Sequence, residues 1–120
     1  MDVYSEALNW ADQRGDSGGA TRMRKLLLSL YNPTFYAYSA GEALAGMDAQ
    51  GGRLAFACLR DYASLGETAT LRRVGDQIRL SGVLDSWIEL CKVKHEASED
   101  LRLRWRLDSN HSTTDCNQDY

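Results

Sequence analysis

The sequence contains few of the residues that build disulfide-stabilised or membrane-spanning proteins. Only one proline, two histidines and three cysteines occur among its 120 residues. Because an odd number of cysteines does not suit a set of paired disulfides, we expect reduced thiols in a reducing compartment. No uninterrupted apolar stretch approaches the roughly 20 residues of a membrane span. Residues 1–6 also lack the basic and then apolar order of a signal peptide. These absences predict a cytoplasmic protein without a membrane segment.

The composition is that of one soluble globular domain. Apolar residues make up 43% of the chain and charged residues 26%, and this length suffices for a single hydrophobic core. The net charge of −3 is spread along the chain. The sequence therefore lacks the basic stripe that would predict tight binding to nucleic acid. We expect a helical domain over residues 1–109 and a polar, disordered tail over residues 110–120.

The first part of the chain has the apolar spacing and the end signals of helices. Pro33 cannot continue a helical hydrogen-bond ladder, so the leucine-rich helix before it must stop there. Ser39 and Glu42 have the spacing of a capping box, and Gly66 suits the left-handed residue that follows a helix. Four helices are therefore predicted: residues 2–14, a helix from Asp16 or Ser17 to Asn32, a short helix from Ser39 to Met47, and a longer one from Asp48 to Gly66.

The segment after Gly66 has two interpretations. Residues 68–80 are compatible with a tight hairpin that turns at Gly75. The apolar side chains further along instead recur at helical spacing, which favours a helix from about Asp76 or Ser81 to Lys92.

Residues 101–107 alternate strictly between apolar side chains and arginine, which is typical of a strand. Such a strand requires a neighbour, for which residues 93–95 or a second copy of the chain are candidates; a helix is the other interpretation. The predicted fold class is therefore mainly α. We expect a compact bundle of four or five helices, with a small β element near residues 93–107 left open.

Residues 15–19 have the sequence Gly-Asp-Ser-Gly-Gly, which is the nucleophile motif of trypsin-like serine proteases. That chemistry needs a histidine that lies well before the serine in that family, whereas His95 and His111 both follow it. No other pair of nucleophile and base has a recognisable spacing either. The sequence therefore predicts a protein that is not an enzyme and that uses no cofactor.

Basic residues follow this glycine-rich turn. Glycines before a helix expose backbone N–H groups, so the turn and the basic side chains after it are a candidate anion or nucleic-acid site. A flexible turn with a solvated basic face is the simpler interpretation. The candidate residues are Arg22, Arg24 and Lys25, with Arg72, Arg73 and Arg79 as a further part of the patch.

Cys91, His95, His111 and Cys116 are four potential zinc ligands. Cys91 and His95 would share one face of a helix, and thiolate with imidazole suits tetrahedral zinc. The usual pair of closely spaced cysteines is absent, and Cys91 also completes an apolar stripe. We therefore predict no metal and keep these four residues as the weak candidate set.

Four aromatic side chains lie within eight residues: Tyr31, Phe35, Tyr36 and Tyr38. Exposed, they would anchor a protein partner. Buried, they would close the core over a loop, and this is favoured because no lysine or arginine is interleaved with them to meet phosphates.

The run from Gly15 to Asn32, GDSGGATRMRKLLLSLYN, resembles a group of small uncharacterised proteins carried by bacterial plasmids and integrative conjugative elements. Their pattern is an Asp-Ser/Thr-Gly turn, a basic residue, a leucine-rich helix and then aromatic-Asn. The resemblance extends through residues 47–48 and 58–62 to Trp87, and the chain departs from the pattern after that residue. It implies a mobile-element accessory protein of the bacterial cytoplasm and supplies no catalytic residues.

The leading functional prediction is an interaction protein that binds and modulates or inhibits a host protein, such as a defence or regulatory component. The absence of a catalytic constellation and the aromatic group around Tyr36 support it. Mild acidity would suit a basic partner surface. The alternative is a nucleic-acid-binding accessory factor, and a homodimer is compatible with both.

Overall fold

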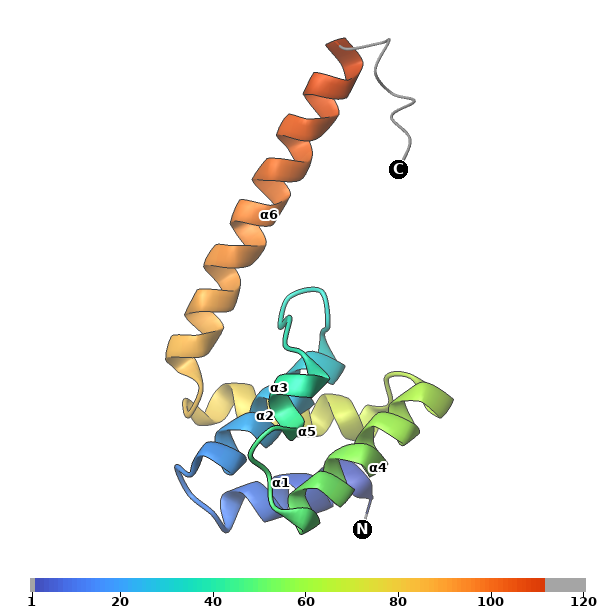
Figure 1. The fold of residues 1–120 in the computed structure, drawn as a ribbon, viewed down its shortest axis with the longest axis vertical. Helices are drawn as coiled ribbons and strands as arrows, with labels where there is room; N and C mark the ends of the chain where they lie inside the picture. Colours follow the sequence, from blue (N-terminus) through green and yellow to red (C-terminus); the bar gives the residue numbers. More distant parts are fainter. Residues whose placement is uncertain (1, 112–120) are drawn as a thin grey trace.

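Six α-helices and no strand make up the part of the chain that the structure describes. The computed structural model describes residues 2–111, with side chains for residues 2–107. The helices are α1 (Val3–Asp12), α2 (Gly18–Tyr31), α3 (Ala40–Leu44), α4 (Ala49–Leu65), α5 (Ala69–Ser81) and α6 (Asp85–His111). Figure 1 shows α1–α5 gathered into one globule from which α6 projects.

Local capping explains where the first five helices begin. In each case a side-chain oxygen accepts a hydrogen bond from a backbone N–H of the first turn, a group that has no partner inside the helix. The capping residues are Asp2, Ser17, Ser39, Asp48 and Thr68. The helices predicted in the first part of the chain are confirmed, including their starts at Ser17, Ser39 and Asp48.

The core lies around α2, which packs against α1, α3, α4 and α5. Its residues Met23, Leu26, Leu27 and Leu28 are almost completely buried. Two glycines allow neighbouring helices to approach closely: Gly51 of α4 lies against the Trp10 ring of α1, and Gly75 of α5 lies against the Tyr31 ring of α2.

The hairpin interpretation of residues 68–80 is wrong, because α5 spans this segment. Leu71, Val74 and Ile78 form the buried helical stripe of α5, and Gly75 supplies close packing in place of a turn. The predicted helix from Asp76 or Ser81 to Lys92 is also corrected. Gly82 adopts a φ of 83°, a left-handed conformation that ends α5, and α6 begins three residues later.

The β element near residues 93–107 is wrong as well, because α6 is continuous through it. The alternation of apolar residues and arginine in residues 101–107 is compatible with either a strand or a helix. Leu101 and Trp105 are four residues apart, as are Leu103 and Leu107, so the same apolar residues also form two stripes along a helix. Leucine, arginine and glutamate are good helix formers, and the described part of the chain offers no strand as a neighbour.

The second half of α6 extends beyond the globule (Figure 1). The molecule measures 56 × 29 × 28 Å along its principal axes, and the long axis follows α6. Residues 110 and 111 of the predicted tail belong to this helix. The remainder of the tail, residues 112–120, lies outside the described residues.

Candidate protein-binding surface

Trp87 connects α6 to the globule through a group of aromatic rings. Its ring centroid lies 6.0 Å from that of Tyr36, with the planes nearly parallel, and 5.9 Å from that of Tyr38, edge to face. About two turns further along α6, the centroid of the His95 ring lies 5.4 Å from that of Phe35. These contacts hold the first three turns of α6 against the loop of residues 32–39.

The four aromatic residues predicted to bind a partner are packed within this group. Tyr36 is only 5% exposed and belongs to the core. Tyr31, Phe35 and Tyr38 are half-buried, and the Tyr31 hydroxyl donates a hydrogen bond of 2.8 Å to Asp76 Oδ1. Tyr36 is therefore a buried packing residue, whereas Phe35 is partly exposed at the molecular surface.

Lys25, one of the predicted anion-binding residues, belongs to the same group. Its Nζ lies 5.6 Å from the Tyr38 ring centroid and 5.4 Å from that of Trp87. An ammonium group over aromatic faces is attracted by their electron-rich centres. Lys25 therefore helps to fix α6 on α2, since Trp87 and Lys25 come from these two helices.

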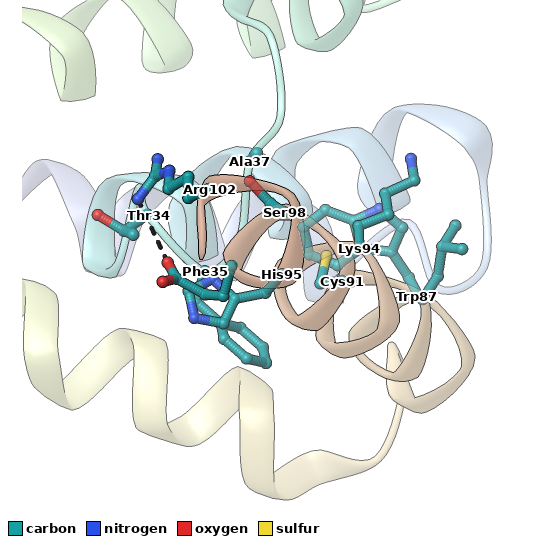
Figure 2. A pocket seen from close by; sticks show the side chains of 11 residues that line it. Thr34, Phe35, Ala37, Trp87, Cys91, Lys94, His95, Ser98 and Arg102 are labelled. Atoms are coloured by element: carbon teal, nitrogen blue, oxygen red, sulfur yellow. Dashed lines mark hydrogen bonds and ion pairs between the residues drawn. The ribbon is translucent and has the colours of Figure 1, made fainter. Parts of the chain in front are cut away.

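A cleft of about 210 Å³ opens between this loop and α6. Its apolar lining includes Phe35 and Trp87, which Figure 2 labels, and Leu90. Three basic or titratable side chains, Lys94, His95 and Arg102, lie on the α6 side together with a single carboxylate, Glu99. Arg102 Nη1 is 3.2 Å from Glu99 Oε1. The cleft therefore combines an apolar floor with a rim on which positive groups prevail.

The apolar face of α6 continues beyond the cleft onto its projecting half. Leu101 is 61% exposed and Trp105 is 71% exposed, and they line a second, shallow groove with Ser98 and Arg102, which belong to the cleft as well. We call the stripe formed by Trp87, Leu90, Ala97, Leu101 and Trp105 the α6 face. Exposed large apolar side chains grouped along one side of a helix are typical of interaction sites.

Arg24, in contrast, is not available to an anion. It is 7% exposed, and its Nη1 donates a 2.8 Å hydrogen bond to the backbone oxygen of Gly15. Its Nη2 donates to the backbone oxygen of Ala11 at 3.3 Å and lies 3.4 Å from Asp12 Oδ1. The guanidinium therefore satisfies carbonyl groups at the end of α1 and fixes the turn that leads into α2.

The arginines of α5 each have a carboxylate within ion-pair distance. Arg72 pairs with Glu67 at 3.7 Å, Arg73 with Asp2 at 3.8 Å, and Arg79 with Asp76 at 3.3 Å. These are exposed pairs of small energetic value. Their partners nevertheless reduce the positive charge that this helix presents.

The zinc candidates are only partly brought together. Cys91 and His95 both line the cleft. His111 lies four and a half turns further along the same continuous helix, about 24 Å from His95 at 1.5 Å per residue, so these two histidines cannot bind one ion in a single chain. Cys116 lies outside the described residues. Among the residues that the structure does describe, no cluster of three or more potential ligands occurs.

Both described thiols are buried. Burial raises the pKa of Cys58 to about 12, and its Sγ lies 3.6 Å from the backbone oxygen of Val3. Burial also raises the pKa of Cys91, although Lys94 and Lys25 act in the opposite direction. A thiol with a raised pKa is a poor nucleophile at neutral pH.

The prediction from sequence missed Trp87, Leu101 and Trp105 as surface residues. Trp87 was assigned to an apolar helical stripe, and the other two to a strand. The helical interpretation of residues 101–107 would have placed Leu101 and Trp105 in register with Trp87, since all three then share one side of the helix.

Comparison of the chain with protein-family models, with curated proteins and with solved structures finds no match. None of the helices within the described residues has the length and apolar character needed to cross a bilayer.

Proposed function

We propose that this protein is a non-enzymatic interaction protein that holds an apolar segment of a partner protein in the cleft between residues 34–37 and α6. In the setting that the resemblance implies, it is a mobile-element accessory that modulates or inhibits a host protein. The observation that carries the proposal is the preformed cleft, in which the large apolar side chain of Leu90 remains 47% exposed. Clusters of aromatic and apolar residues dominate binding energy in protein interfaces.

The charges around the cleft indicate the chemistry of the partner segment. Lys94 and Arg102 outnumber Glu99 at its rim, so an apolar segment with adjacent carboxylates fits best. This differs from the basic partner surface that the net charge of −3 indicates. The local arrangement has more weight, because charges further away than about 8 Å are largely screened at physiological salt.

The nucleic-acid alternative has less support. Arg24 is buried, and the α5 arginines are paired with carboxylates. Arg22 and Lys25 do line a shallow hollow of about 510 Å³, but Glu42 lines it as well. If nucleic acid binds there, gel shifts should weaken with R22E and with rising salt.

The test compares two leucine variants. Leu90→Glu places a charge in the cleft, whereas Leu80→Glu makes the same change at an exposed site of α5 outside it. Host proteins retained by tagged wild type and L80E, but lost with L90E, are identified by mass spectrometry and then titrated in purified form. We expect L90E to weaken binding by at least about 30-fold, the size of a hot-spot loss.

Equal retention by L90E and L80E would refute the cleft as the binding site. Retention of nucleic acid alone, lost with R22E and unaffected by L90E, would support the alternative function. Both leucines are exposed, so circular dichroism and melting should show a folded protein for each variant, which serves as the control for folding.

A further inference from the structure

The projecting half of α6 exposes large apolar side chains to solvent. Residues 96–107 are all exposed, including four large apolar side chains: Leu101, Leu103, Trp105 and Leu107. A helix of 12–15 residues or fewer is marginal in water without a packing partner. Burial of these apolar side chains against a second surface would therefore stabilise this half of α6.

The charges of this half are ordered along the helix. Acidic residues Glu96, Glu99 and Asp100 precede Leu101, and basic residues Arg102, Arg104 and Arg106 follow it. Within one chain, Arg102 pairs with Glu99 at 3.2 Å and Arg104 with Asp100 at 2.9 Å. The helix therefore has a negative and a positive half that meet at Leu101.

We propose that this face binds a second copy of the chain, with the two α6 helices antiparallel and crossing at Leu101. A twofold axis at Leu101 places residues whose numbers add up to 202 opposite one another. Leu101 then meets Leu101 of the second copy, and each Trp105 lies over the small side chain of Ala97 of the second copy. A large residue opposite a small one is the packing that closely approaching helices need.

The charges favour this orientation over the parallel one. In the antiparallel pair the acidic half of each helix lies along the basic half of the other. Asp100, which lies about 100° from Leu101 around the helix, then lies near Arg104 of the second copy. In-register parallel helices would place like charges together, which is unfavourable.

The area involved indicates a reversible association. The stripe around Leu101 and Trp105 supplies on the order of 500 Å² per copy, which is at the low end for specific interfaces. We therefore expect a dimer that forms in the micromolar range and dissociates on dilution. The pairing approaches the rim of the cleft at Ser98 and Arg102, but its central residues Leu101 and Trp105 do not line the cleft, so the inference does not depend on the proposed function.

Sedimentation velocity of the full chain, from low micromolar to submillimolar concentration, tests the pairing. The matched variants are Leu101→Glu and Leu103→Glu. These residues are 61% and 54% exposed, and they lie about 200° apart around the helix. We expect wild type and L103E to shift from monomer to dimer, and L101E to stay monomeric. A wild type that is monomeric throughout, or equal effects of the two variants, would overturn the proposal.

A charge exchange tests the orientation. The variants Asp100→Arg and Arg104→Glu each place like charges opposite one another at this pair, so each alone should dimerise at least about tenfold more weakly than wild type. An equimolar mixture should form a one-to-one heterodimer, because opposite charges then meet at both copies of the pair. Self-association of either variant at the strength of wild type would contradict antiparallel pairing.

Discussion

The two adjacent glycines of α4 give opposite expectations for the same substitution. A Cβ on Gly51 would lie 2.5 Å from Cζ2 of the Trp10 ring, whereas a Cβ on Gly52 would meet nothing within 4 Å. Two other groups lie close to the ring: a Cβ on Gly19 of α2 would be 3.2 Å from its Cη2 atom, and the Arg14 guanidinium lies 4.2 Å from its centroid.

The magnitude follows from two terms. Replacing a helical glycine by alanine stabilises a helix by up to about 1 kcal/mol, and this gain applies to both positions. Carbon atoms prefer a separation of about 3.5–4.0 Å, so Gly51→Ala must displace the ring by about 1 Å, an overpacking that costs about 1–3 kcal/mol. The free energy of unfolding of G51A should therefore be about 1–3 kcal/mol below that of G52A.

Urea unfolding followed by circular dichroism measures this difference. G52A should be as stable as wild type or more stable, and G51A should melt roughly 4–12 °C below G52A, at about 4 °C per kcal/mol. If both variants stabilise the protein equally, the Trp10 ring does not lie between α1 and α4, and the packing described for this core is refuted.

Three further predictions follow from buried or paired groups. The Tyr31 hydroxyl and Arg79 hold the pKa of Asp76 below its usual range. The stabilisation from this carboxylate is therefore present above about pH 4 and is lost as pH falls through the lowered pKa. Urea unfolding should show that D76N is less stable than wild type at neutral pH and equal to it in strong acid. Burial raises the pKa of Cys58 to about 12, so in a chain with Cys58 as its sole cysteine a disulfide reagent at pH 8 should react only on unfolding. Tyr36→Ala should lower the free energy of unfolding by about 3–5 kcal/mol, because Tyr36 is a buried core residue; an unchanged melting temperature would place its ring at the surface.

The first half of the fold was predictable because its signals are local. Ser17, Ser39 and Asp48 each act within three residues of their own position, and Pro33 ends α2 by its own ring geometry. Such signals are visible in any short window of sequence.

Residues 101–107 show where local signals fail. Their period of two suits a strand, while the spacing of Leu101 and Trp105 suits a helix. Packing against the core usually decides between a strand and a helix, but the side chains of residues 101–107 are all exposed. The alternation led to the prediction of a strand, so Leu101 and Trp105 were not placed on the same helix as Trp87.

The site itself depends on contacts across the chain. The aromatic residues around Tyr36 were identified, but Trp87 joins them from about fifty residues further along and no spacing rule relates the two segments. Arg24, in contrast, was assigned a role that its burial rules out. Its position beside other basic residues indicated an anion site, whereas its burial against Gly15 depends on how α1 and α2 cross.

Hydrogen–deuterium exchange with and without a purified partner tests the central claim that the cleft between residues 34–37 and the first half of α6 is the binding surface for a partner protein. Mass spectrometry of the exchanged chain reports each segment separately. We expect the partner to slow exchange in residues 34–37 and in the first half of α6, and to leave α4 and α5 unchanged. Protection confined to the segment around Arg22, with none in α6, would contradict the claim.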